Sequence, residues 1–150
     1  MNKTISILFK TTTLCLLVLL NSCKKESDPA PATQNNTPKT NTELLTSGKW
    51  LEVDARDPNG SLWDKVEECN KDNLMIFKKS GAYEYDAGAK KCDPSEPQIK
   101  EGSGVWAFNA NETRLKVGNL DYQIQELSDS KLTLLLTGTG FSLEVFYVKR

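Results

Sequence analysis

The sequence contains no histidine among its 150 residues. Without an imidazole, the chain cannot build the Ser–His and Cys–His arrangements that activate a nucleophile, or the common zinc sites with histidine ligands. Its 19 lysines and arginines do not outnumber its 20 aspartates and glutamates, so it also lacks the basic excess that a nucleic-acid backbone requires. We therefore expect no enzymatic activity, no metal or cofactor, and no binding to nucleic acid.

The chain also lacks an apolar run long enough to cross a membrane. The run at residues 14–20 has seven residues, whereas a transmembrane helix needs about 20. Lys3 and Lys10 precede this run, and Ser22 is the last residue before the predicted cleavage point. A basic start, a short apolar stretch and a small residue before the cleavage point are typical of a secretory signal peptide. We predict that residues 1–22 are such a peptide.

The residues that end this segment resemble the lipobox of bacterial lipoproteins. Leu20 is the third residue before the predicted cleavage point, and Cys23 is the first residue after that point. Asn21 departs from the small or apolar residue that is common at its position. The resemblance implies that a diacylglyceryl group is attached to the Cys23 thiol and that the new N-terminus can be acylated, for instance with palmitate. Two acyl chains hold a protein stably at a membrane, because each buried CH₂ contributes ~0.8 kcal/mol.

We therefore expect a lipid-anchored protein of the bacterial cell envelope. Its expected place is the outer membrane, facing the periplasm or the cell surface. The alternative is an ordinary signal peptide followed by an unmodified cysteine.

Residues 24–41 contain no large apolar side chain. Such a segment cannot bury enough surface to offset its conformational entropy, so we expect it to be disordered. Together with the lipidated cysteine, residues 23–41 are predicted to form a tether of ~23 Å root-mean-square length. Residues 42–150 then form the single globular domain.

This domain shows short alternating apolar runs separated by turn residues, which is the pattern of an all-β sandwich or barrel. Eight strands are predicted, at residues 50–54, 74–77, 82–85, 104–108, 114–117, 122–127, 131–137 and 141–148. An antiparallel up-and-down meander of eight strands can close into a barrel and so remove its edges. We expect one helical turn within residues 41–48, and long loops at 61–68 and 93–100.

Two cysteines remain after the signal peptide and the lipid site are set aside. Cys69 and Cys92 flank the predicted hairpin, whose turn is Lys79-Ser80-Gly81. If that hairpin forms, the two cysteines lie opposite each other at its open end, in a compartment where disulfides persist. A disulfide closing a loop of this length contributes ~3.5 kcal/mol. A reactive or metal-binding cysteine pair is the alternative.

The same short motif, a glycine two places before a tryptophan, occurs twice, as Gly48-Lys49-Trp50 and as Gly104-Val105-Trp106. A glycine two places before a tryptophan at a strand start lets another backbone or the indole approach closely. The first motif resembles the GxW motif of lipocalins. The order of features over roughly residues 45–150 resembles the lipocalin-like domain of small secreted bacterial lipoproteins. The resemblance implies an eight-stranded lipocalin-like barrel, a disulfide between Cys69 and Cys92, and no enzymatic activity.

Aromatic side chains are the candidates for a ligand site inside this barrel. The candidates are Tyr83, Tyr85, Trp106, Phe108, Tyr122 and Tyr147. An eight-stranded barrel is either filled by its side chains or holds one small ligand. Because the strands are short we expect no large cavity, and we expect Trp50 and Trp106 to plug the ends of the barrel.

Our leading hypothesis is that the domain binds a small hydrophobic or amphipathic molecule. The rival hypothesis is a non-catalytic structural or interaction module, either an accessory subunit or an inhibitor. It would contact an envelope protein through its outer face or through loops 55–68 and 87–100, of which the first carries Trp63.

Overall fold

The computed structural model describes residues 38–150. The predicted signal peptide, Cys23 and residues 23–37 of the predicted tether lie outside the described residues. No helix of the described part is long and apolar enough to cross a membrane.

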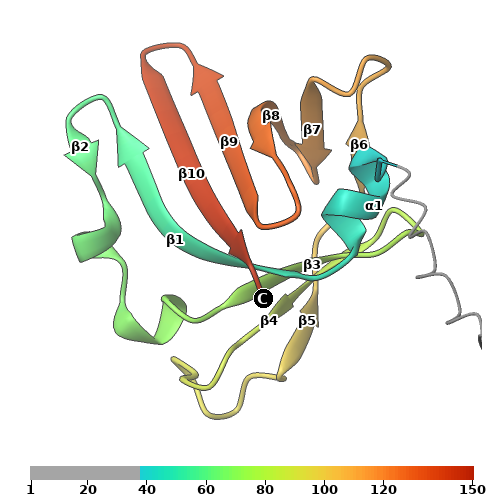
Figure 1. Ribbon diagram of the computed structural model, residues 1–150. Helices are drawn as coiled ribbons and strands as arrows, with labels where there is room; N and C mark the ends of the chain where they lie inside the picture. The colour runs from blue at the N-terminus through green and yellow to red at the C-terminus, as the bar shows by residue number, and fades with distance from the viewer. Residues whose placement is uncertain (1–37) are drawn as a thin grey trace, which may run out of the picture. The chain divides into compact units, whose positions relative to one another are not determined.

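The described chain consists almost entirely of antiparallel strands, with one short helix (Figure 1). The helix is α1 (Asn41–Thr46), and two 3₁₀ turns follow later, η1 (Trp63–Lys65) and η2 (Glu68–Asn70). The strands are β1 (Lys49–Asp57), β2 (Gly60–Ser61), β3 (Leu74–Phe77), β4 (Tyr83–Asp86), β5 (Ile99–Glu101), β6 (Trp106–Phe108), β7 (Arg114–Val117), β8 (Leu120–Leu127), β9 (Lys131–Gly138) and β10 (Phe141–Lys149).

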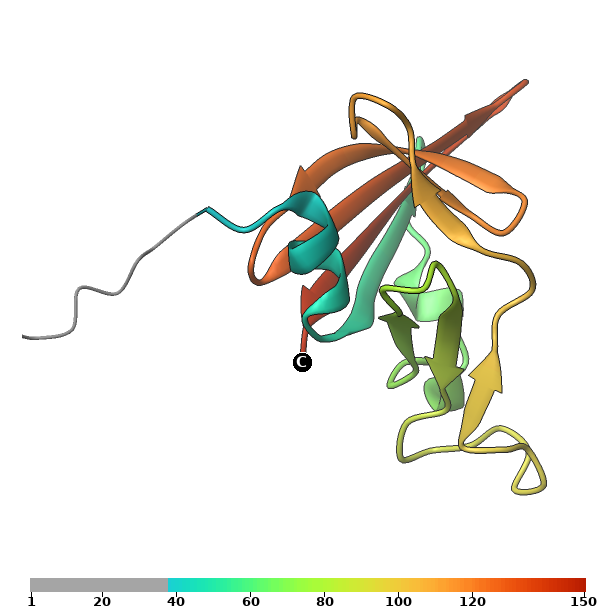
Figure 2. The same cartoon turned by 90° about the vertical axis from the view of Figure 1, so that its right-hand side faces the viewer.

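The strands follow one another round a single strongly curved sheet. Its order is β5-β4-β3-β1-β10-β9-β8-β7-β6, with β2 paired to β1 beside this path. Because β1 pairs with both β3 and β10, the first and last strands of the domain meet, as they do in a closed meander. In the turned view, β3, β4 and β5 lie below β8, β9 and β10 (Figure 2). The predicted all-β, antiparallel architecture is confirmed.

Two details of the prediction were wrong: the sheet of the described chain does not close into a barrel, and it has more than eight strands. Within residues 38–150 the sheet has ten strands and is open between β5 and β6. Both strands lie on the same edge of the β3–β4 hairpin: the Gly102 N–H donates to Tyr83 O (2.8 Å) and the Trp106 N–H to Gly81 O (2.7 Å). Between these bonds the chain bends at Gly104, whose φ is 101°. One side of the sheet therefore ends with β5 and the other begins with β6 (Figure 2).

The predicted hairpin is confirmed, with β3 over the expected residues and β4 shifted by one. Phe77 pairs with Tyr83 at its turn and Leu74 with Asp86 at its open end. The two missed strands lie in or beside predicted loops. β2 is a two-residue extension of the turn at Asp57, and all three residues of β5 are exposed, so β5 shows no alternation of apolar and polar residues.

Helix α1 and the first tryptophan close one end of the curved sheet. Thr40 caps the helix, since its Oγ1 accepts the Glu43 N–H (3.2 Å) while its own N–H donates to Glu43 Oε2 (2.8 Å). Leu45 and Trp50 are fully buried, and the Trp50 indole N–H donates to Leu45 O (2.8 Å). The expected helical turn within residues 41–48 is confirmed, and Trp50 plugs this end.

Lys149 joins the end of β10 to the same helix. Its Nζ lies 4.8 Å from the centroid of the Trp50 ring and donates to Leu44 O (2.8 Å) and Ser47 Oγ (2.8 Å). A Cβ at Gly48 would lie 2.8 Å from Lys149 Cγ. The same Cβ would lie 3.3 Å from the backbone oxygen of Arg150. The glycine of the first GxW motif therefore allows the expected close backbone approach and also leaves room for the Lys149 side chain.

We predict that Leu45→Ala destabilises the domain by about 2–5 kcal/mol, because it leaves a cavity under α1. Leu44→Ala on the same helix removes a side chain that is only partly buried, so its cost is expected to be smaller. Urea unfolding of both variants measures this difference. Equal costs for the two leucines would contradict the described packing of α1.

Candidate functional site

The six aromatic candidates all lie on the concave face of the sheet. Tyr83 and Tyr85 belong to β4, Trp106 and Phe108 to β6, Tyr122 to β8 and Tyr147 to β10. Strand register places them beside the core: Tyr83 pairs with Phe77, Phe108 with Leu115, and Tyr147 with Leu132. The structure therefore brings residues that are far apart in sequence to one interior surface.

Trp106 belongs to the core rather than to an open pocket. Its ring meets Phe77 (centroids 5.9 Å apart) and Phe108 (5.6 Å) edge to face, and its indole N–H donates to Lys78 O (2.9 Å). A Cβ at Gly104 would lie 3.3 Å from the Gly118 Cα. The second GxW motif thus allows a close backbone approach, as expected, and Trp106 is buried as predicted.

A cavity of about 450 Å³ lies on the concave face of β4 and β5. Its wall includes Asn73, Tyr83, Tyr85, Lys100 and Ser103. Tyr83 is buried and donates its hydroxyl to Ser103 O (2.9 Å), whereas Tyr85 is 39% exposed although it lies on the inner face. The cavity is larger than we expected, because the loops around Asn70 and Pro97 extend its wall beyond the short strands β4 and β5.

Glu52 is the interior residue that sequence reasoning missed. It pairs with Tyr147 across the β1–β10 ladder. The β1–β3 register pairs Leu51 with Leu74, so its continuation places Glu52 opposite Asn73, a residue of the cavity wall. The available signal was its position two residues after Trp50, on the same side of the strand.

Burial makes this carboxyl unusual. It raises the pKa of Glu52 above its ordinary value, and a hydrogen bond from the Tyr147 hydroxyl offsets part of that rise. Burial, followed by the neighbouring Tyr85 and Glu52, raises the pKa of Tyr122 to about 12. Burial and then the Glu52 charge raise the pKa of Tyr147 well above its ordinary value. At neutral pH the concave face therefore combines neutral tyrosine hydroxyls with the carboxyl of Glu52.

The loops beside the cavity are held by a disulfide and by an aspartate. Cys69 in η2 is bonded to Cys92, which agrees with the predicted pairing and leaves neither thiol free for a metal. Asp72 Oδ2 accepts the N–H groups of Ala89 (2.8 Å) and Lys90 (3.1 Å). These bonds fix the loop after β4 against the segment before β3, at the open end of the hairpin.

Trp63, the candidate for a partner surface, lies in η1 and is partly buried. The Lys71 Nζ lies 6.0 Å from the centroid of its ring. Its role in contacting another protein stays a prediction.

A family model described as "Lipocalin-like domain" matches residues 33–134. The match covers most of the chain and includes β1 to β8, the disulfide, Glu52 and the cavity wall. No curated protein matches this chain.

We predict that Glu52→Gln stabilises the domain at neutral pH, because glutamine places no charge at this partly buried position. The folded-state pKa of Glu52 is raised, so the folded state holds a proton that the unfolded state has already released. The wild type therefore loses stability as the pH rises through that folded pKa. Thermal unfolding from pH 4 to pH 8 should show the advantage of the variant growing with pH.

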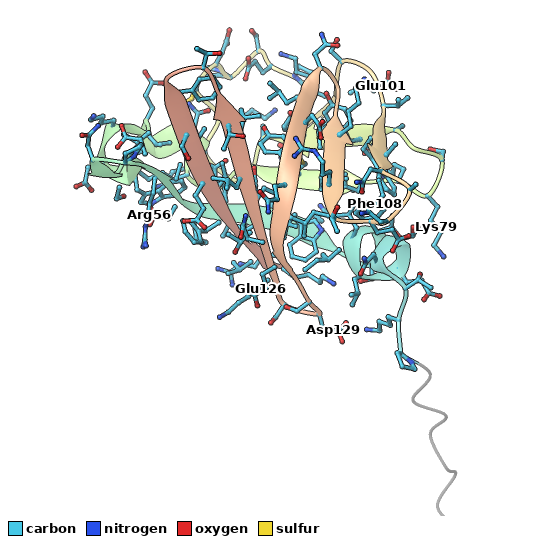
Figure 3. All side chains as sticks on the ribbon, turned by 90° about the horizontal axis from the view of Figure 1, so that it is seen from above. Arg56, Lys79, Glu101, Phe108, Glu126 and Asp129 are labelled. Carbon is cyan, nitrogen blue, oxygen red and sulfur yellow. A yellow bond between two sulfur atoms is a disulfide. The ribbon has the colours of Figure 1, made fainter. Side chains whose placement is uncertain are left out.

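Glu126→Gln is the matched control, since Glu126 is exposed at the outside of the sheet (Figure 3). Its effect should stay within about 0.5 kcal/mol at every pH. An identical pH dependence in wild type and Glu52→Gln would contradict the interior placement of Glu52.

Proposed function

The chain belongs to the lipocalin-like domain family, and from this premise we propose that it binds a small hydrophobic or amphipathic molecule in the cavity beside β4 and β5. The observation that carries the proposal is Tyr85, an aromatic side chain on the concave face that is exposed within a cavity of about 450 Å³. Ligand pockets commonly measure about 300–1,000 Å³ and combine aromatic walls with a few polar groups.

The wall of this cavity offers both kinds of contact. Tyr83 and Tyr85 meet edge to face with centroids 5.7 Å apart, so their rings present a joined apolar surface. Asn73, Lys100 and Ser103 supply polar groups around it. The disulfide and the Asp72 hydrogen bonds hold the adjoining loops, and a preformed wall reduces the entropy lost on binding.

The proposed activity is binding without catalysis, at the surface of a membrane. Cys23 would carry the lipid anchor after removal of residues 1–22, and the polar residues that follow would hold the domain away from the bilayer. The support for this part is the sequence around Cys23 and the affinity of two acyl chains for a bilayer. Such a protein presents its cavity to lipophilic molecules of the cell envelope.

Titration of tryptophan emission with fatty acids, sterols and porphyrins tests ligand binding. We expect saturable quenching by at least one class, and we expect Tyr85→Ala to weaken it about tenfold through loss of aromatic contact area. Phe141→Ala is the control, because Phe141 is an exposed aromatic at the start of β10. Absence of quenching, together with a partner captured by the wild type and lost on Trp63→Ala, would favour the interaction module instead.

Fractionation of cells that express the chain tests the anchor. The wild type should sediment with membranes, and Cys23→Ala should be released, because the thiol that receives the diacylglyceryl group is gone. Cys15→Ala is the matched control and should remain membrane-bound. Equal membrane association of both variants would refute lipidation at Cys23.

A further inference from the structure

Three oxygen-bearing side chains form a row across the inner face of the sheet. Tyr147 on β10 pairs with Glu52 on β1, and the register continued from Leu51 and Leu74 places Asn73 on the other side of Glu52. Asn73 also lines the cavity together with Tyr85. The row therefore runs from the core of the domain to the cavity wall.

Asn73, which lies where this row meets the cavity wall, has a side-chain oxygen that accepts no hydrogen bond. Asn73 Oδ1 is buried and has no hydrogen-bond partner, while its Nδ2 donates to Asn70 Oδ1 (3.1 Å). Among residues 38–150 the only other buried side-chain oxygen without a hydrogen-bond partner is Asp72 Oδ1. That atom lies directly against Gly88. An unpaired buried acceptor is rare in folded proteins, so Asn73 Oδ1 marks a place where a donor fits.

Glu52 has no cationic partner within the described chain. None of the ion pairs of residues 38–150 includes it. Lys149, two residues beyond Tyr147, directs its amino group to α1 instead. The titratable groups that influence or face Glu52 are the hydroxyls of Tyr85, Tyr122 and Tyr147, and Lys100 lies at the cavity wall. Glu52 is partly buried, and a cation beside a partly desolvated carboxylate favours its charged form.

We propose that the ligand is an amphipathic primary amine whose ammonium group binds between Glu52 and Asn73 Oδ1, with its apolar part against Tyr85. This inference rests on the proposed ligand-binding function and names the chemical class of the ligand. An ammonium carries three N–H donors and a positive charge. It supplies the cation that Glu52 lacks and the donor that Asn73 Oδ1 lacks, and the tyrosine rings favour a cation at their faces.

Other head groups match this row less well. A carboxylate or phosphate would meet the Glu52 charge with a like charge in a partly desolvated place. A quaternary ammonium would satisfy the charge but has no N–H to donate to Asn73 Oδ1. A neutral alcohol would donate one hydrogen bond and leave Glu52 without a cation.

Four eight-carbon probes that differ only in the head group test the proposal. They are octylamine, octyltrimethylammonium, octanol and octanoate, titrated calorimetrically at pH 7 into the chain carrying Cys23→Ala, which is expected to be released from the membrane and can be purified without detergent. We expect octylamine to bind about tenfold more tightly than octanol, because its ammonium forms a charge-assisted hydrogen bond that the alcohol cannot form. Octyltrimethylammonium should fall between these two, and octanoate should bind most weakly.

Two variants show whether Glu52 causes the preference. Glu52→Gln should reduce octylamine affinity to that of octanol and leave octanol unchanged. Glu126→Gln removes an exposed carboxylate from the outside of the sheet (Figure 3), so it should leave the preference for the amine intact. Unfolding of each variant is measured alongside to confirm that it is folded.

The outcomes separate the two proposals. If octylamine and octanol bind equally well, and Glu52→Gln changes neither, the cavity binds amphiphiles but the amine proposal is overturned. Tighter binding of octanoate overturns it as well. If none of these probes binds, and the fatty acids, sterols and porphyrins also fail, the ligand-binding function itself is refuted.

Discussion

The pairing of β1 with β10 is the interaction on which the rest of the domain depends. It joins the first and last strands along most of their length, and the pairing of β1 with β3 attaches the hairpin to the same strand. Trp50 lies where these elements meet, bonded to Leu45 of α1 and covered by Lys149. The concave face and the core exist because the first and last strands of the domain pair with each other.

An irregularity in this ladder determines which side chains face inward. The register shifts between Glu52 and Asp54, so Val53 has no partner and the alternation changes phase there. Trp50 and Glu52 face the interior before the bulge, and Ala55 is buried after it. The bulge therefore allows a long strand to bend around the core, and Glu52 is the last inward side chain before the bend.

Local patterns in the sequence were sufficient to predict much of this fold. A continuous apolar run identified β3, and alternating apolar residues identified β7 and most of the longer strands. The turn at Gly81 identified the hairpin that brings Cys69 and Cys92 together. β5 escaped prediction because its three residues are exposed. The opening beside it depends on how Gly102 and Trp106 bond to the β4 edge, which is a long-range property. Of the site, the aromatic residues were predicted, whereas Glu52 was missed because a charged side chain in an alternating strand is normally assigned to solvent.

The position of Glu52 is difficult to explain by stability alone. Glu52 is partly buried, and partial desolvation of a carboxylate without a cation lowers stability, a cost that an uncharged side chain of similar volume would remove. The Tyr147 hydroxyl lessens the cost through a hydrogen bond but adds no positive charge. Residues that weaken a fold are typical of sites where binding requires them. The register of β1 and β3 directs Glu52 toward Asn73, which lines the cavity and carries the unpaired acceptor, so the proposed amine site accounts for both the charge and the acceptor.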